Sequence, residues 1–171
     1  EQLAMVLGRF EGTGRLARSV RSKAGLAYAC GTHFQSQSDL VLVTLSLDLS
    51  PGELPRALGE ILPHLVELRD RGPTQAELDV RRAVQDTQTA SESQVPRILA
   101  CWLAETTLEA RGVEAEGYDE LWRSITPDEI RGVAQRLFAP GNGHLVVRGT
   151  PSPSTEYSVA WGMWVKALGG P

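Results

Sequence analysis

The apolar positions of this chain recur at two different periods, which predict helices in some segments and strands in others. Segments 3–8 and 15–25 each carry an apolar helical stripe that ends at a glycine, so each predicts a helix. Strand-like runs follow at 26–34 and 40–49, and the second alternates cleanly near its end. Because the residues between them, 35–39, are polar, we predict an antiparallel hairpin.

Three further helices are predicted from their first residues. The run Ser50–Glu53 reads as a capping box with proline at the first helical position, and the runs Thr74–Glu77 and Thr126–Glu129 open the other two helices. The helix after Ser50 should end at Gly72, and Pro63 should kink or locally break it. Two shorter helices are expected at 98–110 and 118–122, and a last strand at 144–148.

These elements predict an α+β fold, a two-layer αβ domain whose mostly antiparallel sheet has helices packed on one face. We expect residues 1–150 to form this domain, truncated at its N-terminal side because the chain opens in an uncapped helical pattern. Residues 151–171 form an aromatic tail. Its period-two alternation from Tyr157 to Val165 favours a strand, although Tyr157, Trp161, Trp164 and Leu168 also share one helical stripe.

The composition argues against some classes of function. Residues are 42% hydrophobic and 22% charged, which is typical of a soluble globular protein. The net charge is −4 and basic residues are scattered, which argues against nucleic acid or an anionic membrane as the main partner. No apolar run is long enough to span a membrane. Cys30 and Cys101 lie in no metal or redox pattern and are expected to be buried free thiols.

The candidate chemistry lies at Arg21 and Tyr28. They are seven residues apart, on either side of a glycine that ends a helix, so both side chains can point toward one place. A guanidinium and a phenol donate hydrogen bonds suited to a carbonyl that gains negative charge. Two plainer interpretations stay open: an ordinary exposed helical arginine, and a strand tyrosine with its ring in the core.

Other chemistry finds less support in the sequence. The three histidines, His33, His64 and His144, stand apart, and none has a second His or a Glu at the spacing of a zinc helix. No Gly-x-Ser-x-Gly elbow or activated cysteine is recognisable, so no catalytic residue is predicted in this chain alone. The polar stretch 85–94 either lines a cavity or partner surface, or is a simple exposed helix.

Nucleotide binding is a competing interpretation. Gly12-Thr-Gly14-Arg-Leu-Ala matches a loose Gly-x-Gly-x-x-Ala pattern that leads into a helix. A dinucleotide site also needs a strand directly before the loop, whereas residues 1–7 have a helical pattern. A structural glycine loop is the simpler interpretation.

From Gly14 to Tyr28 the chain resembles the pitrilysin, insulinase and mitochondrial-processing-peptidase family of zinc metallopeptidases. The match is to their second, non-catalytic domain. It continues through the two strands, the run Gly72–Leu78 and the run 124–134, and so covers about residues 3–149.

The resemblance implies that two domains each contribute part of one active site. Two similar αβ domains enclose an unfolded peptide; the first carries the zinc motif, and the second contributes an arginine and a tyrosine near the scissile bond. These fall on Arg21 and Tyr28. The resemblance implies that Tyr28 donates to the scissile or adjacent carbonyl, and that Arg21 orients it or binds substrate. Zinc is then expected on a homologous partner or upstream domain, in a homodimer or heterodimer.

The chain also departs from the family pattern. No His-x-x-Glu-His occurs, so hydrolysis by this chain alone is not expected, and the loop Gly8–Gly14 lacks the usual paired glycines and serines. An alternative is therefore an inactive family member that acts as a structural partner subunit. The expected setting is soluble, in the bacterial cytoplasm or periplasm.

Overall fold

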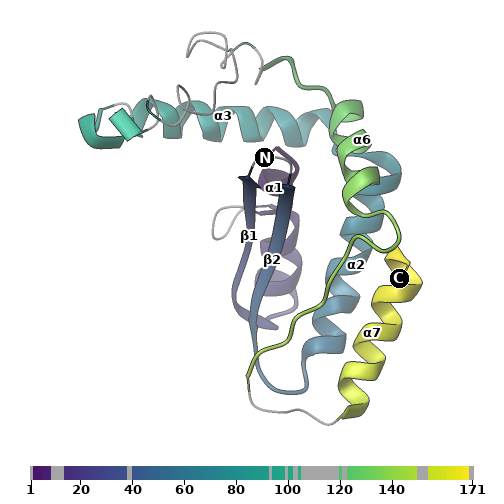
Figure 1. Cartoon of the computed structure of the whole chain (residues 1–171). Coiled ribbons are helices and arrows are strands. Elements are labelled where there is room, and N and C mark those ends of the chain that lie inside the picture. The colour runs from purple at the N-terminus through teal and green to yellow at the C-terminus, as the bar shows by residue number, and fades with distance from the viewer. Residues whose placement is uncertain are drawn as a thin grey trace. The chain divides into compact units, whose positions relative to one another are not determined.

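The computed structural model describes residues 2–8, 14–37, 40–92, 94–98, 100–101, 104, 120, 123–149 and 154–169. They form two compact units, one made of residues 1–73 and 130–171 and the other of residues 74–129. Figure 1 shows the elements along the chain. The helices predicted at 98–110 and 118–122 lie mostly outside the described residues.

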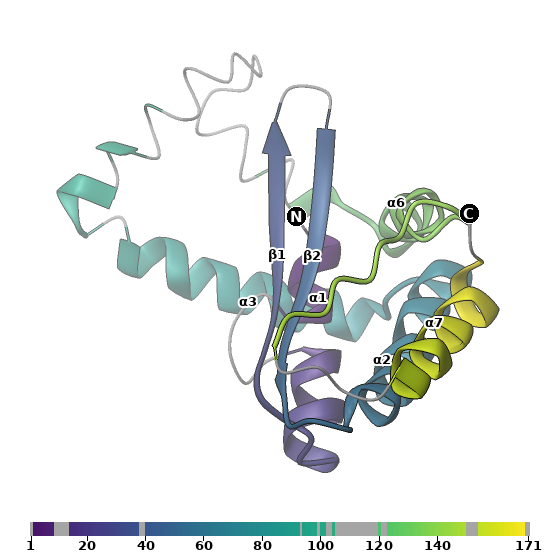
Figure 2. The ribbon, with the colours of Figure 1, turned by 60° about the horizontal axis from the view of Figure 1, so that its bottom comes forward.

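The predicted hairpin is confirmed in the first unit. Strands β1 (Ala27–Gln37) and β2 (Leu40–Leu49) pair antiparallel, with Thr32 opposite Leu45 and His33 opposite Thr44 (Figures 1 and 2). Burial alternates along β1, where Thr32 is buried and His33 is exposed. The sheet therefore has an inner face toward the core and an outer face with polar residues.

Helices pack against β1, as the α+β prediction requires. Helix α1 (Gln2–Leu7) and the helical segment η1 (Ala17–Lys23) both contact this strand. The Thr32 backbone N–H donates to the Gly8 carbonyl at 3.1 Å, which ties the end of α1 to β1. The buried apolar side chains here include Leu3, Val6, Leu7, Leu16 and Val20. The fold class predicted from the sequence is confirmed for the described elements.

Helix α2 (Leu54–Arg71) begins differently from the prediction. Its N-cap residue is Glu53, which makes no capping hydrogen bond with its side chain, and Pro51 lies in the preceding turn. The Leu54 N–H donates instead to Glu156 Oε1 at 3.2 Å. The predicted capping box at Ser50 is therefore wrong, because a carboxylate distant in sequence satisfies the start of this helix.

Pro63 does not break α2, which is continuous from Leu54 to Arg71. Proline removes one N–H and crowds the carbonyl four residues earlier, which belongs to Gly59. Gly59 and Pro63 are both exposed, so water can bind the carbonyl that the proline leaves unpaired. The opposite face supplies the core with Ala57, Leu58, Ile61, Leu62, Leu65 and Leu68.

The C-terminal tail is a helix, α7 (Ser154–Leu168), so the strand favoured from the alternating pattern is wrong. Figures 1 and 2 show α7 beside α2. The two helices run parallel, since Glu156 meets the start of α2 and Arg69 Nη1 donates to the Ala167 carbonyl at 3.3 Å. The buried positions Ala160 and Leu168, with half-buried Trp164, follow a helical spacing that this packing selects.

The segment predicted as the last strand, 144–148, has no regular secondary structure and pairs with no strand among the described residues. A strand requires a ladder of backbone hydrogen bonds, and the described sheet contains β1 and β2. Gly143 at the start of this segment leaves room for the Trp164 ring, whose Cε2 atom would lie 3.0 Å from an added Cβ.

The cysteine prediction is confirmed in part. Cys30 and Cys101 are both free thiols, and Cys30 is buried, which raises its pKa. Cys101 is exposed rather than buried.

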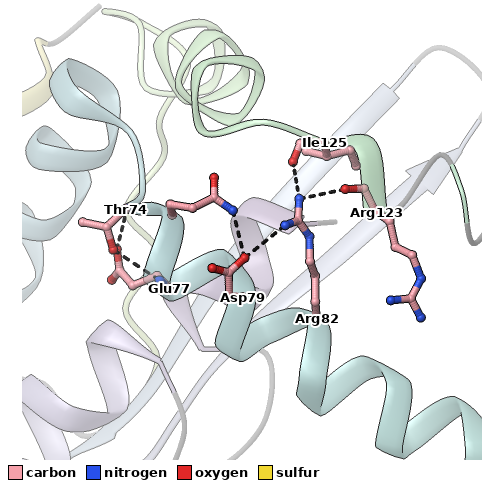
Figure 3. A network of polar contacts seen from close by, with 7 residues as sticks. Thr74, Glu77, Asp79, Arg82, Arg123 and Ile125 are labelled. Atoms are coloured by element: carbon pink, nitrogen blue, oxygen red, sulfur yellow. Dashed lines mark hydrogen bonds and ion pairs between the residues drawn. The ribbon is translucent and has the colours of Figure 1, made fainter.

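The second unit is built around α3 (Gln75–Glu92). Its predicted start is confirmed, and it is a capping box: the Thr74 N–H donates to Glu77 Oε2 at 2.9 Å and the Glu77 N–H to Thr74 Oγ1 at 3.2 Å. Figure 3 shows how Arg82 then holds the chain that follows, donating at 2.8 Å to the carbonyls of Arg123 and Ile125.

Helix α6 (Pro127–Leu137) starts where the run Thr126–Glu129 predicts, with a capping box. The Thr126 N–H donates to Glu129 Oε2 at 2.8 Å, and the Glu129 N–H donates to Thr126 Oγ1 at 3.3 Å. These bonds hold the pKa of Glu129 below its usual value. The box begins in the second unit, and the helix continues into the first.

Candidate substrate-contacting site

Arg21 lies in a π-helical turn. Segment η1 (Ala17–Lys23) has the wider π-helical winding over seven residues, which is rare and is frequently found at functional sites. The Ala24 N–H donates to the Ser19 carbonyl at 3.0 Å, a bond that spans five residues and encloses Arg21. The Arg21 side chain is exposed.

The glycine after this turn sets the direction of the chain toward β1. Gly25 has φ of +63°, a conformation that favours glycine, whereas an added Cβ there would meet nothing within 4 Å. The backbone angle rather than crowding therefore requires the glycine. The Leu26 N–H donates to the Val20 carbonyl at 2.9 Å and closes the end of η1 against the start of β1.

Tyr28 lies at a β-bulge. Ala27 pairs with Leu49 and Cys30 with Leu47, so Tyr28 and Ala29 lie opposite the single residue Asp48. Bulges redirect side chains and are over-represented next to active sites. Tyr28 is 88% exposed, so the alternative with its ring in the core is wrong.

The structure thus places both sequence-predicted residues in one short segment, at the base of the hairpin where η1 passes into β1 (Figure 2). Both side chains are exposed, and each can donate hydrogen bonds to an external acceptor. This arrangement suits a surface that meets a peptide backbone. The exposure of Arg21 alone is equally compatible with an ordinary helical arginine.

Sequence reasoning missed the polar contacts beneath this turn. Arg15 Nη1 lies 2.7 Å from Glu67 Oε2, and Ser19 Oγ donates to Glu60 Oε2 at 2.6 Å. Arg15 and Ser19 are only 8% and 7% exposed. A sequence signal does exist, because Arg15 and Ser19 are four residues apart and Glu60 and Glu67 are seven apart, so each pair shares a helical face.

His64 lies between the two glutamates on α2. Burial and the nearby Arg15 lower its pKa, and Lys23 adds to this effect. Glu67 and Glu60 act in the opposite direction without cancelling it. His64 is therefore mainly neutral at neutral pH. It does not compete as a cation with Arg15 for Glu67 or with Ser19 for Glu60.

Comparison with known proteins identifies the domain type. Residues 2–84 match the family model described as the peptidase M16 inactive domain. This segment is therefore similar to the peptidase M16 inactive domain. The matched residues contain η1, the hairpin and α2, so they include Arg21, Tyr28 and the contacts beneath them.

Solved structures share this fold. A protease from Helicobacter pylori has a TM-score of 0.69 at 20% identity, covering 79% of this chain and 33% of its own. A peptidase M16 inactive domain from Pseudomonas fluorescens has a TM-score of 0.63 at 19% identity, covering 79% of this chain and 32% of its own. This chain therefore spans about a third of both proteins. A comparison with curated proteins found no match.

The described part of this chain offers no zinc site. No group of three or more His, Cys, Asp or Glu residues there is placed to hold a metal ion.

None of the described helices is both long and apolar enough to cross a membrane.

The nucleotide interpretation also loses its structural basis in the described residues. The described residues directly before the glycine loop form helix α1 rather than a strand. An added Cβ at Gly14 would lie 2.7 Å from the Gly8 backbone nitrogen, so Gly14 is required for close backbone packing. Gly12 lies outside the described residues.

Part of the polar stretch lies on an open face of α3 in the second unit, beside apolar residues of the same helix. The face is formed by Val80, Ala83, Val84, Thr87, Gln88 and Ser91. It shows no convergent polar groups, so a cavity or partner surface at this face stays a prediction beside that of a simple exposed helix.

Proposed function

We propose that this chain is the second, non-catalytic half of a zinc-dependent peptidase, which closes the substrate chamber and contacts the peptide near the scissile bond. Tyr28 donates to the scissile or adjacent carbonyl, and Arg21 orients that carbonyl or binds the substrate directly. The observation that carries the proposal is the 88% exposure of Tyr28 at a bulge directly after the Arg21 turn.

The chemical role of the two side chains follows from where charge develops. When water attacks a peptide carbonyl, its oxygen gains negative charge, and preorganised donors stabilise that state more than the starting amide. A phenol supplies one short hydrogen bond, and a guanidinium supplies fixed, charged donors.

Zinc belongs to the partner domain in this proposal. Bound there, it would activate the attacking water and polarise the carbonyl. The described residues of this chain do not fit a zinc site, so their contribution is to bind and orient the peptide. The partner is a homologous zinc-bearing domain or subunit, and the two together are called the complete peptidase below.

The alternative of an inactive structural subunit uses the same fold for assembly alone. It gives no role to two exposed donors held by a π-helical turn and a bulge. The two proposals therefore differ in whether Arg21 and Tyr28 affect peptide cleavage.

Arg21→Ala in the complete peptidase is expected to lower kcat/KM by about tenfold or more, since a charged hydrogen bond to substrate is lost. Arg18→Ala is the matched control, because Arg18 is also exposed and lies one turn earlier, where its Nε donates to the Gly14 carbonyl at 3.2 Å. Peptide hydrolysis is measured for both variants. Equal kcat/KM values for Arg21→Ala and Arg18→Ala would favour the structural subunit.

A further inference from the structure

Ser19 connects the turn that carries Arg21 to helix α2. Its carbonyl accepts the Ala24 N–H at 3.0 Å, the bond that encloses Arg21, and its hydroxyl donates to Glu60 Oε2 at 2.6 Å. The distance to Glu60 is that of a charge-assisted O–H···O⁻ bond, which is about twice as strong as a neutral one. Ser19 thus takes part both in the backbone bond that defines the π-helical winding and in the side-chain bond that attaches the turn to α2.

The π-helical winding needs such an attachment. Extended π-helix is rare because the α-helical winding is normally preferred, so the wider turn persists only where its surroundings hold it. Ser19 is 7% exposed whereas Glu60 is exposed, so their hydrogen bond is partly shielded from competing water. The Arg15–Glu67 pair anchors the residues before the turn to the same face of α2.

We infer that Glu60 is a positioning residue for Arg21: acting through Ser19, it holds the π-helical turn so that the guanidinium meets the peptide. This inference rests on the proposed function, because it gives Arg21 a substrate to meet. Glu60 is exposed on α2 and accepts the hydrogen bond of Ser19. It therefore acts on Arg21 through Ser19.

The test is a double-mutant cycle in the complete peptidase. Glu60→Ala is expected to lower kcat/KM by about tenfold, since misplacing a binding group by a fraction of an ångström is costly. In the Arg21→Ala background the same change should lower kcat/KM by less than about twofold, because Glu60 acts through a side chain that is already absent. Glu60→Gln keeps an oxygen that accepts from Ser19 and should retain most of the activity.

Glu156→Ala is the matched control. It removes a carboxylate whose hydrogen-bond partner, the Leu54 N–H, also lies in the first unit but belongs to the start of α2 rather than to η1. It should lower the thermal midpoint without lowering kcat/KM at a temperature where the protein is folded. Amide hydrogen exchange at Ala24 and Leu26, which report the η1 bonds, should accelerate in Glu60→Ala and not in Glu156→Ala.

The outcomes separate the two proposals. If Arg21→Ala lowers kcat/KM but Glu60→Ala leaves it unchanged, or lowers it by the same factor in both backgrounds, the positioning role of Glu60 is wrong and the proposed function stands. If Arg21→Ala has no effect, the proposed function fails at Arg21. If Glu156→Ala lowers kcat/KM as much as Glu60→Ala does, the effect of Glu60 comes from a general loss of stability and the positioning role is wrong.

Discussion

Replacing Tyr28 by phenylalanine in the complete peptidase is expected to lower kcat by about tenfold or more. The change removes one hydroxyl and keeps the ring. Because Tyr28 is 88% exposed, the free energy of unfolding should stay the same. A loss of kcat without a loss of stability would then report a hydrogen bond that is made in the transition state.

The control for this prediction is Tyr157→Phe. Tyr157 lies on α7 and undergoes the same chemical change away from the η1–β1 segment, so hydrolysis should be unaffected. Steady-state kinetics on an unfolded peptide substrate, together with thermal melts, make the comparison. Unchanged kcat in Tyr28→Phe would refute the assigned role of the phenol.

Truncating Leu65 to alanine is expected to produce the largest loss of stability. Leu65 is 0% exposed on the inner stripe of α2, between the neighbouring buried residues Ile61 and Leu68. Removing a fully buried leucine side chain costs about 2–5 kcal/mol of unfolding free energy, depending on how far the cavity collapses. Urea denaturation followed by circular dichroism measures this loss.

Leu40→Ala provides the comparison for Leu65. It is the same substitution at a position that is 65% exposed, at the start of β2, and it should cost less than about 1 kcal/mol. Similar losses for the two variants would mean that α2 does not pack through this stripe.

Local patterns were sufficient to predict the parts of the fold whose determinants are close in sequence. The hairpin follows from two alternating runs around a polar turn, and the boxes at Thr74 and Thr126 follow from side chains three residues apart. In the boxes the interacting groups are three residues apart, and in the hairpin two neighbouring runs are joined by a short polar turn, so the sequence displays both directly.

Distant contacts explain where the sequence predictions failed. The start of α2 is satisfied by Glu156, about a hundred residues later, and no local motif records that. The tail forms a helix because α2 and the space at Gly143 accommodate Trp164, whereas its sequence alternates like a strand. Tertiary packing overrides a weak periodic signal in such segments.

The candidate site was predictable in residue identity but not in geometry. Spacing and family resemblance pointed to Arg21 and Tyr28, while the π-helical turn and the bulge that present them could not be predicted. A π-helical turn depends on the surrounding contacts that hold it, and a bulge depends on the register with β2. The Ser19–Glu60 bond likewise joins segments 41 residues apart.

The central claim, that this chain supplies one half of a shared active site, is tested most directly by reconstitution. Hydrolysis of an unfolded peptide is measured for this chain alone, for the zinc-bearing domain alone, and for both together. We predict cleavage only in the mixture, and its loss when Arg21→Ala and Tyr28→Phe are combined in this chain. Cleavage at the full rate by the zinc-bearing domain alone, or no cleavage in an assembled mixture, would contradict the account.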